Sequence, residues 1–129
     1  MDKEKYTLEF LINASSKIIY NCLTSPSGLS EWFADDVNIR NDIYTFKWDG
    51  SEEDARLLNK KRDEFARYIW LADEEEGNDV FFEMRIKIDD LTGELALIIT
   101  DFAEEDELEE AKMLWESQID SLKQALGSS

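Results

Sequence analysis

The sequence predicts an α+β fold in which a curved antiparallel sheet of about six or seven strands surrounds one long C-terminal helix. Much of the chain alternates apolar and polar residues in segments separated by short turns, which is typical of half-buried strands. Residues 25–37 carry the signals of two short helices, and residues 104–126 carry an apolar stripe at helical spacing. The 129 residues suit one domain, 1–129, that folds as a unit.

The chain is predicted to begin with a strand followed by a short helix. In residues 5–13 apolar side chains recur at every second position, with Leu11 as an apolar exception on the other side. Ser15 or Ser16 can then cap a helix over residues 17–24. Cys22 lies on the apolar face of that helix, so we expect a buried structural thiol. As the one cysteine of the sequence, it excludes an intramolecular disulfide.

Residues 25–37 predict a second short helix after a Pro/Gly joint. Ser25 can cap this helix, and Pro26 suits its first turn because the N–H that proline lacks has no intrahelical partner there. Leu29, Trp32 and Phe33 have the spacing that places three large apolar groups on one face. The segment therefore reads as the lid or the floor of a pocket.

The middle of the chain reads as a meander of strands joined by turns such as Asn41-Asp42 and Asp49-Gly50. The strands are predicted at residues 37–40, 43–48, 55–60, 65–72, 80–89 and 94–102. Residues 73–78 are expected to form a solvated acidic turn. The inward positions of one strand are expected to be Val80, Phe82, Met84, Ile86 and Ile88.

The C-terminal segment, residues 104–126, is predicted to form the long helix. Its acidic first turn and Lys123 near its other end suit the helix dipole, and Gly127 is expected to end it. The apolar stripe comprises Leu108, Ala111, Trp115, Ile119, Leu122 and Leu126. This stripe has to pack on the inner face of the sheet, since the sequence offers no other apolar surface for it.

The charge of the chain excludes two classes of partner. The sequence has 14 basic and 31 acidic side chains, no histidine and a formal net charge of −17. Such a surface repels phosphate backbones and anionic headgroups, so we expect neither nucleic acid nor membrane binding. The sequence shows no signal peptide and no apolar run of bilayer length, so we expect a cytoplasmic protein.

These patterns together resemble the START-like, or helix-grip, superfamily (SRPBCC, Bet v 1-like), nearest to its Aha1-type domains. The resemblance rests on a leading strand with Leu8 and Phe10, Ile18-Ile19-Tyr20 with Leu23, the run at residues 25–34, the last strand with Leu95, Leu97, Ile99 and Phe102, and the terminal helix with Trp115, Ile119, Leu122-Lys123 and Leu126. It implies the helix-grip fold and a gap between sheet and helix. The chain is far more acidic than a typical Aha1-type domain, and it lacks the histidine of a cyclase-type dyad.

The resemblance and the alternation together give a set of candidate ligand-binding residues. Trp32 and Phe33 are expected at the entrance of a cavity between the sheet and the C-terminal helix. The other candidates are Tyr44, Phe46, Trp48, Phe82, Met84, Leu97, Ile99, Trp115 and Ile119. The alternative interpretation is that these residues simply fill the core.

The sequence shows no catalytic constellation. We find no Ser or Cys with a partner base and no metal-ligand spacing, so no enzyme activity, metal or cofactor is expected. Arg67, Glu83 and Arg85 fall on the outer face of the sheet, where ion pairing is the ordinary role of such groups.

Two functions from different classes follow. The first is non-enzymatic binding of a small hydrophobic or amphipathic ligand in the cavity. The alternative is an acidic protein-interaction module, like a co-chaperone or regulator, with a filled core and a basic protein partner. An enzymatic reading, as a cyclase or hydrolase, ranks last. Because an open meander has edge strands, we expect a monomer or a weak dimer.

Overall fold

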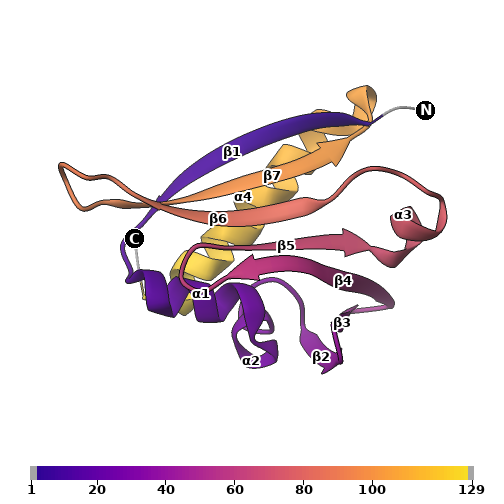
Figure 1. Ribbon diagram of the computed structural model, residues 1–129, viewed down its shortest axis with the longest axis horizontal. Helices are drawn as coiled ribbons and strands as arrows, with labels where there is room; N and C mark the ends of the chain where they lie inside the picture. The colour runs from indigo at the N-terminus through magenta and orange to yellow at the C-terminus, as the bar shows by residue number, and fades with distance from the viewer. Residues whose placement is uncertain (1–2, 128–129) are drawn as a thin grey trace.

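The computed structural model describes residues 3–127, in which seven antiparallel strands form one curved sheet and α4 crosses one of its faces (Figure 1). The strands are β1 (Glu4–Ile12), β2 (Asp36–Arg40), β3 (Ile43–Trp48), β4 (Ser51–Lys61), β5 (Phe65–Trp70), β6 (Phe82–Ile88) and β7 (Leu95–Ala103). The helices are α1 (Ser16–Thr24), α2 (Pro26–Leu29), α3 (Leu71–Glu75), the 3-10 turn η1 (Glu105–Glu107) and α4 (Leu108–Ala125). The strand order β1-β7-β6-β5-β4-β3-β2 confirms the predicted helix-grip architecture.

The core lies between the concave face of the sheet and α4. Alternate residues of β7 point inward, and Leu97 and Ile99 have no solvent exposure. They meet the apolar stripe of α4, where Trp115, Ile119 and Leu122 are buried. The alternation and the helical stripe therefore predicted the two surfaces that form this core.

The caps of α1 and α2 form as the sequence predicted, but α2 ends at Leu29, so Trp32 and Phe33 lie in the turn that follows it and not on a helical face. The side chain of Ser15 caps α1, and the hydroxyl of Ser25 accepts from the Gly28 N–H at 2.9 Å to cap α2. Gly28 packs so closely on α1 that a Cβ atom there would overlap the carbonyl oxygen of Asn21 and lie 2.8 Å from the Cα of Cys22. The glycine is therefore required by close approach of the two helices, not by its backbone angles.

The C-terminal end of α1 is held by side chains from elsewhere in the core. The last carbonyls of a helix have no partner within it, and burying them unpaired would be costly. Indole and phenol groups supply the missing donors. Trp32, Tyr68 and Tyr44 donate to the carbonyls of Cys22, Leu23 and Thr24, at 2.8, 2.5 and 2.7 Å.

Four sequence predictions need correction. The strand expected at 55–60 is longer, because β4 begins at Ser51 directly after the Asp49-Gly50 turn and residues 51–54 pair with β3. The strand expected at 65–72 ends at Trp70, and Leu71–Glu75 form α3 within the expected acidic turn, because Asp73 and Glu74 in its first turn suit the helix dipole. β6 begins at Phe82, so Val80 precedes it, and Ile88 is 50% exposed because the β6–β7 hairpin projects beyond the core (Figure 1). The acidic start of the expected C-terminal helix is the 3-10 turn η1, and α4 begins at Leu108.

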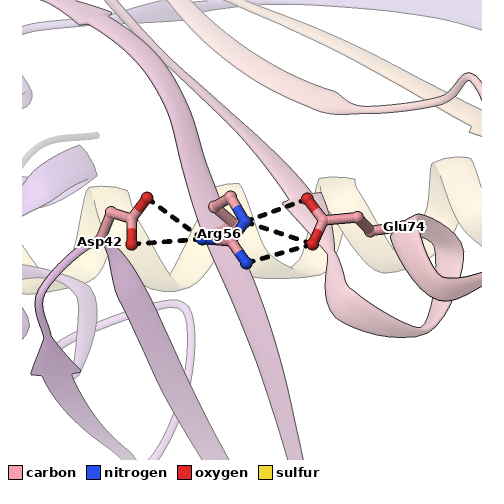
Figure 2. Close-up of polar contacts among 3 residues, drawn as sticks. All are labelled: Asp42, Arg56 and Glu74. Carbon is pink, nitrogen blue, oxygen red and sulfur yellow. Dashed lines mark hydrogen bonds and ion pairs between the residues drawn. The ribbon is translucent and has the colours of Figure 1, made fainter.

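Arg56 of β4 links two segments that flank this strand, as Figure 2 shows. Its guanidinium lies between Glu74 of α3, at 3.0 Å, and Asp42 of the β2–β3 turn, at 3.3 Å. The three side chains lie at the surface, so their pairing is screened by salt and fixes position more than it adds stability. This contact helps to explain why α3 docks against the sheet.

The predicted charge cluster forms on the outer face of the sheet. Glu83 is only 6% exposed and accepts from Arg67 of β5 at 2.7 Å and from Arg85 at 3.1 Å. The two guanidinium groups stack on Phe81 and Phe65, each 4.2 Å from the ring centroid. Burial alone would raise the pKa of Glu83, but the hydrogen bonds from Arg85 and Arg67 hold it below its ordinary value.

We expect Glu83→Gln to lower the free energy of unfolding by about 1–3 kcal/mol at neutral pH, since both arginines lose a charged acceptor. A carboxyl with a lowered pKa in the folded state stabilises the protein above its ordinary pKa and loses that effect as the pH falls. Urea unfolding should therefore show the wild-type and variant curves converging below about pH 4. Glu9→Gln, at an exposed position of β1, is the control. A gap that is unchanged at acid pH would contradict the assignment.

None of the helices within residues 3–127 combines the length and the apolar character that crossing a bilayer requires.

Candidate functional site

A cavity of about 430 Å³ lies between the concave face of the sheet and α4. This volume falls within the roughly 300–1,000 Å³ of small-molecule sites. Its wall includes the exposed side chains of Glu53 and Leu114 as well as the buried ring of Phe33, so it runs from solvent into the core. The lining residues are Phe33, Trp48, Glu53, Trp70, Phe82, Asp101, Leu114, Trp115 and Gln118.

Phe33, in the segment between α2 and β2, is the centre of the aromatic wall. Its ring centroid lies 5.9 Å from those of both Phe82 and Trp115 and 6.0 Å from that of Trp48. Its backbone carbonyl accepts from Trp48 Nε1 at 2.9 Å and from Gln118 Nε2 at 3.3 Å. Phe33 thus contacts residues of β3, β6 and α4 around the cavity.

Asp101 places a carboxylate on the inner face of β7. It follows Leu97 and Ile99 at the same spacing, so it interrupts a row of inward apolar side chains. Its Oδ2 accepts from Trp115 Nε1 at 2.9 Å and from the Tyr6 hydroxyl at 3.3 Å. Burial raises the pKa of Asp101, and these hydrogen bonds offset only part of the rise.

The residues predicted for the site divide into three groups. Phe33, Trp48, Phe82 and Trp115 line the cavity. Trp32 and Tyr44 lie at the end of α1, where they donate to its last carbonyls. The remaining candidates have no solvent exposure and pack within the core; these are Phe46, Met84, Leu97, Ile99 and Ile119.

Sequence reasoning missed Glu53, Trp70, Asp101, Leu114 and Gln118. The alternation of the strands carried a signal for the first three, because each continues the inward row of its own strand. The last two flank Trp115 on α4, at the edge of its apolar stripe. Extending the inward rows of the strands by one position would have found Glu53, Trp70 and Asp101.

A second hollow, of about 440 Å³, lies where the end of β1 meets the β6–β7 turn. Its wall is formed by residues 11–14 and 92–95, and it contains no aromatic ring. Polar atoms make up most of this surface. It is therefore a poorer site for an apolar molecule than the cavity beneath α4.

Among residues 3–127, one group of carboxylates has the spacing to hold a metal ion. The side chains of Glu104, Asp106 and Glu107 approach within 4.8 Å of one another before α4. Repulsion from Glu104 is the main cause that raises the pKa of Glu107. Because exposed acidic groups of this kind are common without an ion, the cluster does not define a metal site.

Several solved protein structures are similar to this chain. A solved structure from Bacteroides fragilis is 36% identical in sequence, with 98% of this chain and 93% of that chain covered and a TM-score of 0.68. The Aha1 dimer from Colwellia psychrerythraea is 18% identical, with 95% and 96% covered and a TM-score of 0.81. A protein from Mesorhizobium loti is 19% identical, with 96% and 97% covered and a TM-score of 0.75.

The last two similarities concern the fold alone, given their low identity. No curated protein sequence matches the chain. A family model described as the START-like superfamily domain matches residues 1–128, which is nearly the whole sequence. With the seven-stranded sheet of residues 3–127 around α4, this match shows that the chain belongs to the START-like superfamily.

Proposed function

We propose that the protein binds a small hydrophobic or amphipathic molecule in the cavity beneath α4 and catalyses no reaction on it. The observation that carries this proposal is an aromatic-walled cavity of about 430 Å³ that reaches from solvent into the core. Burying an apolar ligand there would release roughly 25 cal/mol for each Å² of apolar surface removed from water. A few polar groups beside these rings would orient the ligand.

The alternative, an acidic interaction module with a filled core, has less support. Its acidic surface is present, with a net charge of −17 that would attract a basic protein. This alternative assumes a filled core, however, whereas a cavity of about 430 Å³ lies beneath α4. We therefore favour ligand binding.

Leu114 and Met113 of α4 offer a matched test. They are neighbours with similar exposure, 61% and 65%, but only Leu114 lines the cavity. We expect Leu114→Gln to weaken binding of the neutral dye Nile red about five-fold, because the dye loses about 1 kcal/mol of apolar contact. Met113→Gln should leave the affinity unchanged. Fluorescence titration measures both, and unfolding curves should differ little, since surface changes cost about 0.5 kcal/mol or less.

Equal dye affinity in the two variants would show that the dye binds elsewhere and would remove the support for this cavity as the site. Native mass spectrometry of freshly purified protein provides the complementary measurement. A bound small molecule that is retained by Met113→Gln and lost by Leu114→Gln would give direct support.

A further inference from the structure

The charged groups in the wall of the cavity are all acidic. Glu53 of β4 and Asp101 of β7 are its ionisable residues, and among the described lining residues there is no lysine or arginine. Glu53 lies two positions before the fully buried Ala55, so it continues the inward row of β4 to an exposed position. Asp101 continues the inward row of β7 and is partly buried. The carboxylates therefore come from strands on different sides of the concave face.

Most hydrogen-bond donors of the wall are already engaged within the protein. Trp115 Nε1 donates to Asp101, and Trp48 Nε1 and Gln118 Nε2 both donate to the Phe33 carbonyl. Among the side-chain donors of the described lining residues, the Trp70 indole N–H and the second N–H of the Gln118 amide keep no acceptor within the protein, and both groups are neutral. The wall thus offers a ligand mainly acceptors: the Glu53 carboxylate, the remaining lone pairs of Asp101 and the Gln118 carbonyl.

The apolar part of the wall is itself suited to a cation. Trp48 and Trp70 have ring centroids 6.3 Å apart, and the ring of Trp70 stacks on Phe82 at 4.9 Å. Indole faces carry a negative potential that attracts ammonium groups, and aromatic sites beside carboxylates bind quaternary ammonium ions. An anionic ligand would instead meet two carboxylates in a protein with a net charge of −17.

We propose that the ligand is a cationic amphiphile, with an ammonium group held by Glu53, Asp101 and the aromatic faces and an apolar part beneath α4. This inference rests on the proposed function, since it names the chemical class of the molecule that the cavity binds. Among the groups that act on the Asp101 carboxyl the basic one is Lys3, which pairs with Asp73 at 3.0 Å. Lys3 lines a neighbouring hollow that shares Asp101 and Trp70 with this cavity, but it is not part of the cavity wall.

The test compares three molecules with one apolar chain: decyltrimethylammonium, decanol and decanoate, each below its micellar concentration. Each is titrated against Nile red bound to the protein, at neutral pH and moderate salt. We expect the ammonium compound to displace the dye at about ten-fold lower concentration than decanoate, with decanol between them.

The variants separate the cavity from the general surface charge. Glu53→Gln with Asp101→Asn should remove most of the preference for the ammonium compound. Glu52→Gln with Asp54→Asn removes the same charge from exposed positions on the opposite face of β4 and should keep the preference. The amide oxygen introduced at position 54 can still accept from the Thr45 hydroxyl. If the double variant fails to fold, Glu53→Gln alone, at an exposed position, should remove part of the preference for the ammonium compound.

Each outcome bears on one proposal. A preference lost only in the inner variants supports the inference, whereas a preference weakened equally in both double variants reflects surface charge and overturns it. Equal displacement by the three compounds also overturns it, but leaves ligand binding intact. If Nile red fails to bind the wild-type protein at all, the proposed function fails and the inference falls with it.

Discussion

Replacing Phe33 with alanine is expected to lower the free energy of unfolding by about 3–5 kcal/mol, the largest effect of any single change considered for this protein. The ring is only 4% exposed and packs against aromatic residues of the sheet and of α4. Its contacts include Phe46, with centroids 4.9 Å apart, and Trp115 at 5.9 Å. Removing the ring would leave a hole where these elements meet and would enlarge the cavity that Phe33 lines.

Urea unfolding at neutral pH measures this effect, and Phe102→Ala is its control. Phe102 lies on the outer face of β7, half-buried, where its ring meets that of Phe81 at 5.2 Å. We expect the control to cost clearly less. If the two variants lose the same stability, Phe33 is an ordinary packing residue and not the centre of the aromatic wall.

The second large effect is expected from Gly28→Ala, which should destabilise the protein by about 1–3 kcal/mol. In an unconstrained helix the same substitution would add up to about 1 kcal/mol, so even the sign is informative. The loss is expected because the new methyl group would overlap the Asn21 carbonyl oxygen and crowd the Cα of Cys22. Either α1 and α2 must separate, or their packing must distort.

Thermal and urea unfolding test this prediction. Ser27→Ala is the matched control, because Ser27 is exposed on the same short helix and should change stability by about 0.5 kcal/mol or less. A stabilised Gly28→Ala variant would refute the close approach of α1 and α2. An α1–α2 joint that loosens should also weaken Nile red binding, since the segment that carries Phe33 begins there.

The fold was largely predictable because its strands and its long helix follow simple periodicities. The site was less so. Phe46 and Trp48 sit two residues apart on the same face of β3, yet Phe46 is fully buried and only Trp48 reaches the cavity. Alternation tells which face a side chain occupies. How far α4 fills the concave face decides which of those side chains remain beside open space, and that depends on packing across the whole sheet.

Helix α3 shows a second limit. Trp70 ends β5 and Leu71 begins a helix at once, so the apolar run in the sequence crosses the boundary between two kinds of structure. The ion pair between Glu74 and Arg56, which are 18 residues apart in the sequence, helps to hold α3 in place. A contact of that range leaves no mark in a local pattern.

The order of strands has a consequence for how the chain folds. β1 is an edge strand of the described sheet, and its partner is β7, with Glu4 opposite Ala103. During synthesis β1 therefore emerges long before β7. Until β7 is made, the backbone N–H and C=O groups of β1 have no strand partner. Such non-local pairing slows folding. The meander from β2 to β6 joins sequential neighbours and can assemble first, so closure of β1 onto β7 is expected to be the late step of folding.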